Sequence, residues 1–558
     1  MKHFILFFIL ISHITLSQNI NVNNDYNYSL IRTAILSNQI QSEFSLNLKP
    51  INSAELKKVG SNQHKIIVKN KSGSIKIKSL GVDYFFEYNS RHPYNRNNGT
   101  MIPNRGYQHI ISPGLYFKTG PLTIQIKPEH HYSQNINFDG FWEGHYAEIW
   151  AKRYQLWNTI DMPERFGLKE HNKTTFGQSS IRLNYRNLSL GISSENLWWG
   201  PSIRNSIMMS NNAQGFKHIT LNTLRPIKTF IGNFEFQIVS GKLESSGFTP
   251  PNTDYEFAGT KLYIPKINQL SETDDWRYLQ GFIVSYSPSF IKNTSFGLIR
   301  WVNMYSALIE GRYTWMLGNP TYFPAFNNLF RKNDKFVDYE AQTNQAAGIF
   351  VKSLWTDAKA EIYFEFYHND SKQNLRDLFL DSEHSRASTL GLQKVFQGKK
   401  DNFLFSWEWT QMEQSASRLI RNAGSWYQHG YVYDGYTNKG EVLGSSIGPG
   451  SNSHFISLER LRDNEKVGLA LEIVENDNDF YHEAFASAND FRRYWKDINF
   501  HINFHKGFKK YVISSNLIYS RSLNYQWELN DNTEPYYHPG KDTNNFHCSI
   551  KLTYFGNW

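Results

Sequence analysis

The sequence predicts an all-β protein, a transmembrane antiparallel β-barrel of about 18 strands. The last stretch of the chain, residues 545–558, alternates apolar and polar residues with a period of two, as a strand with one dry and one wet face does. Along most of the chain, similar stretches are separated by gaps that are alternately short and long. Aromatic residues make up 16% of the chain, which suits the aromatic belts of a membrane barrel.

The composition argues against helical membrane spans in the body of the chain. No run of about 18 apolar residues follows the N-terminus, and the mean hydropathy is −0.55. A barrel is compatible with these values, because its apolar residues alternate with polar ones and escape a hydropathy window. A sugar-binding surface would also explain the many aromatic residues. A multidomain soluble β protein is the alternative fold.

The first residues resemble an export signal. Lys2 gives the charged start, residues 4–11 form the apolar core, and Thr15 and Ser17 precede a cleavage point before Gln18. We therefore assign residues 1–17 to a signal peptide, with a short buried helix as the alternative. The single cysteine, Cys548, excludes a disulfide framework and falls on the apolar row of the last strand.

Residues 18–70 do not alternate well and are predicted to form a small N-terminal periplasmic segment. Residues 29–38 and 53–59 are expected to be short helices, the second one capped by Ser53. Residues 71–558 are assigned to the outer-membrane β-barrel, with long extracellular loops.

The strand count comes from the gaps. Short gaps lie near residues 119–120, 186–187, 226–229, 288–294, 355–358, 397–401, 463–465 and 506–508. Longer gaps lie at about 89–107, 133–173, 199–214, 241–276, 305–342, 370–384, 413–450, 477–493 and 521–544. Short turns on one side and long loops on the other are typical of bacterial outer-membrane barrels. The last strand is expected to close the barrel, since an open edge in lipid leaves backbone groups without partners.

Motifs that could carry catalysis or bind metal have simpler explanations. His501 and His505 lie on the clearest strand, residues 498–505, where they would stand about 13 Å apart, too far to share a metal ion. Ser446 matches a G-x-S-x-G pattern, but the Gly-Pro-Gly that follows cannot readily start a helix. Glu361 and Glu365 share a strand face and are interpreted as lumen lining. We therefore predict no catalytic residues, no metal site and no cofactor.

The formal net charge is +9 and the isoelectric point is about 9.1, without any basic tract. This balance favours an anionic partner such as an acidic polysaccharide or lipopolysaccharide, although a scattered solvated surface would explain it equally well. The export signal argues against nucleic acid.

Three stretches are too specific for a generic barrel. They are residues 195–201 (ENLWWGP) continuing through Arg204 to 210–213 (SNNA), residues 376–378 (RDL) with 383–387 (EHSRA), and residues 426–429 (WYQH) with 435–440 (GYTNKG) and 447–452 (IGPGSN). Together they resemble the Wzi-like capsule assembly family of outer-membrane proteins. The resemblance covers most of the chain from about residue 75.

The resemblance implies a lectin-like barrel of eighteen strands. Such a protein binds capsular or exported polysaccharide and helps to assemble or retain it at the cell surface, and it is not a polymerising enzyme. Its other expected partners are outer-membrane lipids, lipopolysaccharide and the barrel-assembly machinery. The alternative is an outer-membrane channel or porin for small solutes or saccharides, and a barrel hydrolase is a weaker third reading.

The three stretches lie in or beside long loops, so their side chains either contact sugar or fold inward as a plug. Sugars are held by aromatic faces and by polar groups that bond to hydroxyls or carboxylates. The candidates are Trp198, Trp199, Arg204, Asn211, Asn212, His384, Arg386, Trp426, Tyr427, Tyr436 and Asn438.

Overall fold

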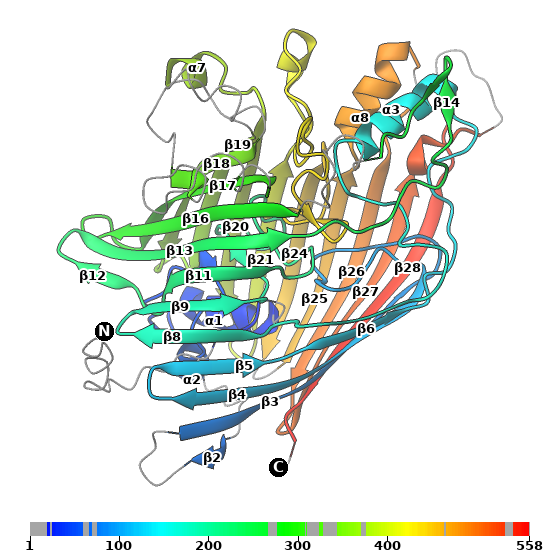
Figure 1. The fold of residues 1–558 in the computed structure, drawn as a ribbon. Helices are drawn as coiled ribbons and strands as arrows, with labels where there is room; N and C mark the ends of the chain where they lie inside the picture. The colour runs from blue at the N-terminus through cyan, green and yellow to red at the C-terminus, as the bar shows by residue number, and fades with distance from the viewer. Residues whose placement is uncertain are drawn as a thin grey trace, which may run out of the picture.

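The protein is a closed barrel whose strands run antiparallel to their neighbours throughout (Figure 1). The computed structural model describes residues 19–22, 25–59, 66–69, 75–265, 276–306, 309, 323–326, 343–369, 375–462, 465–490, 492–530 and 539–556. The predicted signal peptide, residues 1–17, lies outside the described residues.

The barrel has 18 strands, as the gap spacing predicted. Three of them are built from two segments each, because the ladder is interrupted within them. In order, the strands are β3 (Ile75–Asn89), β4 (Gly106–Thr119), β5 (Leu122–Ile126) with β6 (Glu129–Ser133), β7 (His171–Thr175) with β8 (Ser180–Tyr185), β9 (Leu188–Ser193), β11 (Lys217–Thr223) with β12 (Ile227–Thr229), β13 (Gly232–Leu243), β16 (Arg277–Pro288), β17 (Thr294–Tyr305), β18 (Asn344–Trp355), β19 (Ala360–Asn369), β20 (Arg386–Gln397), β21 (Asn402–Gln411), β24 (Asn452–Arg462), β25 (Glu465–Glu475), β26 (Lys496–Gly507), β27 (Tyr511–Leu523) and β28 (Thr543–Tyr554).

Closure is made by the last strand. β28 pairs with β27 along its whole length and with β3 from Tyr554–Val82 to His547–Asn89. Its two faces differ as the period of two predicted: Phe546 is 46% exposed on the outside, whereas His547 is 2% exposed on the inside. A short strand, β2 (Ile66–Lys69), pairs with the beginning of β3.

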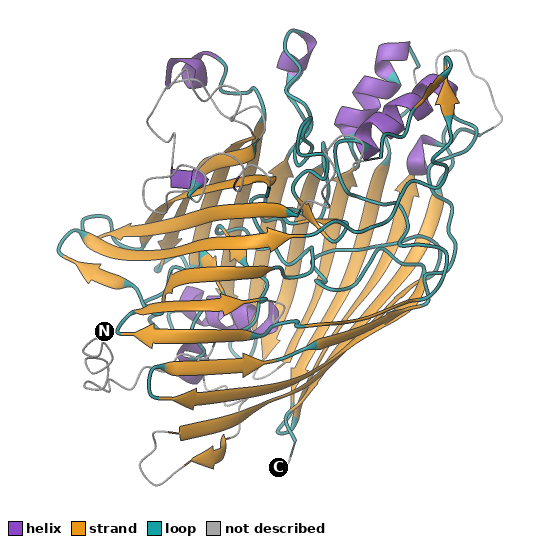
Figure 2. Ribbon diagram, in the orientation of Figure 1, coloured by secondary structure: helices purple, strands orange, loops and turns teal. Residues whose placement is uncertain are grey.

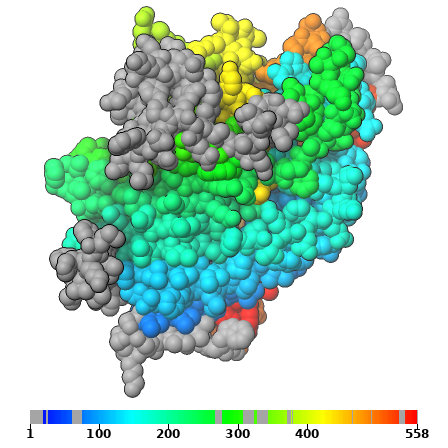
Figure 3. Space-filling view, in the orientation of Figure 1, coloured from blue at the N-terminus to red at the C-terminus, as the bar shows by residue number. Residues whose placement is uncertain are grey.

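The barrel wall exposes apolar side chains outward. Ile181, Leu183, Leu190, Ile192 and Ile219, on β8, β9 and β11, are each at least 50% exposed, as expected for strands that face lipid. In the space-filling view this part of the wall rises from the blue and cyan residues to the green ones (Figure 3). Among the described residues, no helix is both long and apolar enough to cross a membrane.

The two ends of the barrel differ. At the short-turn end, consecutive strands are joined by brief turns such as 119–122, 397–402 and 507–511. At the long-loop end, the connections carry α3 (Ala147–Trp157), α7 (Leu375–Leu380), α8 (Asn478–Ala484) and the hairpin β14 (Glu256–Phe257)–β15 (Thr260–Lys261). Figure 2 shows these helices above the barrel strands. Most of the gaps predicted as short lie at these turns, but the one predicted at residues 226–229 is wrong: residues 227–229 form β12, and the turn lies at residues 230–231.

The N-terminal segment, residues 19–59, lies inside the barrel. It holds α1 (Asp25–Leu36), α2 (Ala54–Lys58) and β1 (Leu48–Lys49), and Figure 1 shows α1 behind the front strands. Arg32 makes an ion pair of 2.8 Å with Glu361 of β19, and the Ser45 backbone N–H donates to Glu235 of β13. Leu36 packs on Val395 and Leu404, which lie next to a short turn. The segment predicted to precede the barrel therefore fills the short-turn half of the lumen.

Both predicted helices of this segment are present, but the predicted cap is wrong. The Ser53 side chain makes no capping hydrogen bond at the start of α2. The Asn52 side chain accepts the Ala54 N–H at 2.9 Å instead, so the polar residue one position earlier takes the capping role.

Candidate functional site

The long loops fold into the barrel and form a second filling, which we call the loop layer: residues 194–216 and 425–451. Its core is the largest buried hydrophobic cluster of the described residues, with Trp199, Met209, Tyr427 and Tyr436 among its members. The loop layer occupies the long-loop half of the lumen, above the N-terminal segment.

The aromatic candidates are structural members of this layer. Tyr436 stacks on Trp301 of β17 with ring centroids 3.8 Å apart, and its hydroxyl donates to the Met208 carbonyl. The Tyr427 hydroxyl donates to the Ile207 carbonyl, and Trp426 is 1% exposed. All three side chains are enclosed by the protein in this structure.

Two wall carboxylates fasten the layer to the barrel. Glu408 of β21 accepts the backbone N–H groups of Ile203, Arg204 and Asn205 at distances between 2.7 and 3.2 Å. It also accepts the Tyr363 hydroxyl at 2.7 Å. Glu365 of β19 accepts the Ser202 N–H at 2.8 Å. The turn that follows Gly200 thus presents successive N–H groups to the oxygens of two buried carboxyl groups.

Arg204 is neutralised inside the barrel. Its guanidinium binds Glu472 of β25 with both Nε and Nη2, at 3.0 and 3.1 Å, and donates to the Tyr94 hydroxyl at 2.7 Å. It also lies over the Phe455 ring. The ion pair with Glu472 fixes the loop layer to the barrel wall and leaves little of the arginine charge for an external ligand, and the Tyr94 bond connects the layer to the first long loop.

The asparagine candidates join loops to one another. Asn211 donates to the Asn97 carbonyl at 2.7 Å, and Asn212 donates to the Val442 carbonyl at 3.1 Å. Asn438 donates to the Gln214 carbonyl at 3.0 Å. Each amide therefore connects two segments that are distant in sequence.

The second motif lies apart from the loop layer. His384 Nδ1 lies 3.8 Å from Asp381 Oδ2, and the His384 carbonyl oxygen lies 3.1 Å from His368 Nδ1. Arg386 begins β20, and its Nη1 is buried without a hydrogen-bond partner among the described residues. Neither residue lines the cavity described next.

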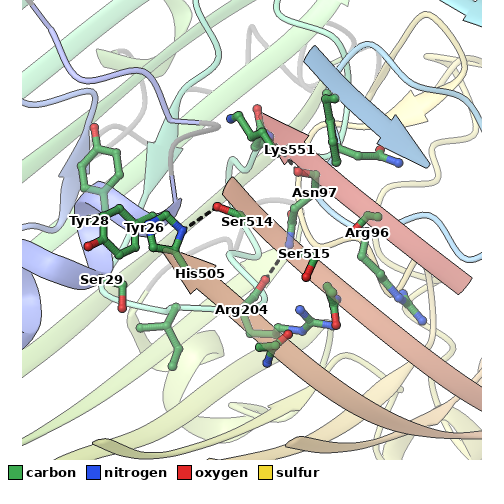
Figure 4. A pocket seen from close by; sticks show the side chains of 18 of the residues that line it. Tyr26, Tyr28, Ser29, Arg96, Asn97, Arg204, His505, Ser514, Ser515 and Lys551 are labelled. Carbon is green, nitrogen blue, oxygen red and sulfur yellow. Dashed lines mark hydrogen bonds between the residues drawn. The ribbon is translucent and has the colours of Figure 1, made fainter. Parts of the chain in front are cut away.

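A cavity of about 390 Å³ lies inside the lumen, and both fillings contribute to its lining (Figure 4). Its lining comes from the N-terminal segment, from residues 94–100, from the loop layer and from lumen-facing wall residues. Three predicted residues line it: Trp198, Arg204 and Asn211. Figure 4 shows Tyr26 beside His505, and His505 Nδ1 lies 2.6 Å from Ser514 Oγ.

Sequence reasoning missed the wall carboxylates as anchors. Glu365 was recognised only as lumen lining, and Glu408 and Glu472 were not singled out. The available signal was their position on the polar row of strands, since a buried carboxylate must find donors inside the lumen. Which donors they bind could not be read from the strand itself.

His501 and His505 are 2% and 5% exposed on the lumen face. Ser446 is followed by β24 rather than by a helix, so the strand–turn–helix of a nucleophile elbow does not form there. Within the described ranges, no group of three or more metal-binding side chains comes together.

Two acidic residues at the start of α8 are held in unfavourable surroundings. The Asp477 side chain caps the helix by accepting the Phe480 N–H at 3.1 Å. Burial, assisted by the nearby Asp479, raises the pKa of Asp477 to about 7. Burial raises the pKa of Asp479 to about 6, although its carboxylate accepts hydrogen bonds from Ser425 and Gln414.

We expect acidification to stabilise the loop that carries α8. Both carboxyls bind protons more tightly in the folded loop than at their ordinary value of 3.8. The stability from protonation is therefore fully present below about pH 4 and is lost as the pH rises through 6 and 7. The protection factors of the amides in residues 475–490, that is, their exchange rates in detergent relative to the intrinsic rates at the same pH, should be higher at pH 5 than at pH 8. Asp477→Asn, which keeps the cap oxygen, should raise the protection factors at pH 8 and reduce their pH dependence; protection factors that stay unchanged would contradict this.

Comparison with known proteins agrees with this architecture. The family model of the capsule assembly protein Wzi matches residues 104–271 and 318–513. Among solved structures, the outer-membrane protein Wzi of Escherichia coli, described as a carbohydrate-binding β-barrel involved in group 1 capsule assembly, is similar with a TM-score of 0.58 and 12% identity. The match covers 96% of this chain and 99% of that one. OccAB2 of Acinetobacter baumannii matches with a TM-score of 0.39 and 9% identity, over 85% of this chain and 98% of that one. No protein of curated function matches the sequence.

Proposed function

The chain belongs to the Wzi capsule assembly family, and on this basis we propose that it is an outer-membrane, lectin-like barrel that binds capsular or exported polysaccharide and helps to retain it at the cell surface. The observation that carries the proposal is the family match over most of the chain, together with the two fillings that the described residues place in the lumen. The similar E. coli barrel binds carbohydrate, which supports the ligand class.

In this proposal the long-loop end faces the outside of the cell, and the short-turn end, with the N-terminal segment, faces the periplasm. The distribution of short turns and long loops supports this orientation, because outer-membrane barrels place their long loops outside. The wall contacts outer-membrane lipids and lipopolysaccharide, and insertion depends on the barrel-assembly machinery. The aromatic residues exposed on β28 support such a lipid contact.

The binding is proposed to be noncatalytic and the polymer acidic. The net charge of +9 supports an acidic partner. Arg204 is paired with Glu472, so Arg386 is the better suited of the two predicted arginines to meet a carboxylate. Direct sugar contact by the other predicted residues is also part of the proposal, and Trp198 and Asn211, which line the lumen cavity, are less enclosed than Trp199 or Tyr436.

The experiment is a deletion strain complemented with the wild-type gene. We expect the deletion to release polysaccharide from cells into the medium, because the polymer loses its contacts at the surface. Released and cell-bound polysaccharide are measured separately, with total synthesis as the control. Normal retention and an unchanged surface polysaccharide would overturn the proposal in favour of the channel.

The channel alternative makes an opposite prediction for planar bilayers. Because the described lumen is filled by the N-terminal segment and the loop layer, we expect the purified barrel to show no large, steady single-channel conductance. The control is a porin of similar strand number, recorded under the same conditions. Steady openings of comparable size would indicate a continuous wet path and support a transport function.

A further inference from the structure

An outward groove lies at the long-loop end, away from the lumen cavity. It is bordered by α3, by residues 422–431 and by α8, and has a volume of about 580 Å³. Figure 1 shows α3 and α8 beside each other above the barrel. The volume is within the range of pockets that bind small organic ligands, about 300–1,000 Å³. We call it the outer groove.

The lining of the outer groove is rich in amides. Asn422 donates to Glu483 Oε1 at 2.9 Å, and Gln428 Oε1 lies 3.3 Å from the Thr159 hydroxyl that donates to it. Asn369, at the end of β19, is 7% exposed, and its Oδ1 has no hydrogen-bond partner among the described residues. These groups can exchange hydrogen bonds with hydroxyls, which are both donors and acceptors.

The groove is also lined by an accessible aromatic side chain and by small residues. Tyr431 is 56% exposed, so its ring is accessible to a ligand. Residues 423 and 424 are Ala and Gly, and a Cβ added at Gly424 or Gly430 would meet no heavy atom within 4 Å. An accessible aromatic ring, amides and open space over glycine suit the flat face and polar rim of a sugar ring.

We propose that the outer groove binds one uncharged, hydroxyl-rich sugar unit of the polysaccharide. This inference rests on the proposed function and specifies where one unit of the polymer is held. The charge of the lining indicates the class of unit. Asp479 and Glu483 supply two carboxylates, Lys152 supplies one ammonium group, and the ring of His429 accepts two backbone N–H groups through Nδ1. A negatively charged unit would be repelled there, whereas acidic units of the same polymer would contact the protein elsewhere.

Such a contact is weak by itself. Retention would come from repeated units along one polymer, which bind neighbouring barrels and raise the effective concentration of each next unit. The contact in the groove should depend little on ionic strength, because it relies on hydrogen bonds and ring packing instead of ion pairs.

The test fills the groove without straining the chain. Gly430 is exposed and its backbone lies outside the left-handed region, so Gly430→Trp places a large side chain into open space. Gly430→Ala is the matched control. The probes are the polysaccharide purified from the cells that express the protein and short neutral oligosaccharides released from it by mild acid. Binding to the purified full-length barrel is measured at low and at high salt.

We expect wild type and Gly430→Ala to bind both probes, and Gly430→Trp to lose at least about tenfold in affinity for the neutral oligosaccharides, equally at both salt concentrations. Tyr431→Ala should give a smaller loss in the same direction. Wild-type affinity of Gly430→Trp for the neutral probe, with the barrel folded, would overturn the outer-groove site alone. If the wild type binds neither probe, the proposed function itself would be overturned.

Discussion

A chain that ends before β28, at residue 542, should fail to accumulate as a folded outer-membrane barrel. Without β28, the backbone of β27 from Tyr511 to Ser522 and that of β3 from Val82 to Asn89 would face lipid without hydrogen-bond partners. Each unpaired group costs several kcal/mol in the hydrocarbon region, so the total exceeds the stability of a typical domain. Heat-modifiable mobility on gels and protease resistance of membrane fractions measure the outcome.

A shorter truncation that removes only residues 554–558 is a more demanding version of the same experiment. It takes away the last pairs of the ladder, Tyr554 with Tyr511 and with Val82, and the aromatic end of the chain. We expect loss of outer-membrane assembly here too. The control is Tyr554→Phe, which keeps the backbone and the ring. A heat-modifiable barrel made by the shorter chain would show that closure does not depend on its end.

The second large effect is expected from Glu408→Ala. This carboxylate is 1% exposed and accepts three backbone N–H groups of the loop layer. Leaving a buried donor without a partner costs about 1–3 kcal/mol. Because the substitution leaves three N–H donors without their acceptor, the turn at residues 203–205 should detach from the barrel wall. The expected results are rapid proteolysis within residues 194–216 and new current in planar bilayers, while the barrel remains closed.

The matched control for that experiment is Glu459→Ala. Glu459 is also a buried carboxylate on the lumen face, but its ion pair is with Lys466 on the neighbouring strand at 2.8 Å. We expect its removal to leave proteolysis of the loop layer unchanged. If both variants open the layer equally, general destabilisation of the lumen explains the effect and the anchoring role assigned to Glu408 is wrong.

The strands could be predicted from the sequence because their signals are local. On β26, Phe500 is 53% exposed outside and His501 is 2% exposed inside, as the alternation of residues 498–505 required. Turn residues mark where each strand ends, and closure follows from the cost of an open edge in lipid. The number of strands needs no knowledge of tertiary contacts.

The contents of the lumen could not be predicted in this way. Arg32 meets Glu361, and Ser45 meets Glu235, across long stretches of sequence, so nothing near residues 19–59 indicates that they lie inside the barrel. The loop motifs were recognised, but whether Tyr436 presents its ring to a sugar or stacks on Trp301 depends on where β17 stands in the closed sheet. Sugar contact by the motif residues stays a prediction.

The pairing of β1 with β10 (Trp198–Trp199) connects the two fillings of the lumen. Leu48 pairs with Trp199, the Gly200 N–H donates to the Asn47 carbonyl at 2.9 Å, and the Lys49 ammonium lies 4.5 Å from the centre of the Trp198 ring. Groups that share hydrogen bonds in this way open together in local unfolding. The N-terminal segment and the loop layer are therefore one cooperative unit, and a force that withdraws either of them from the barrel acts on both.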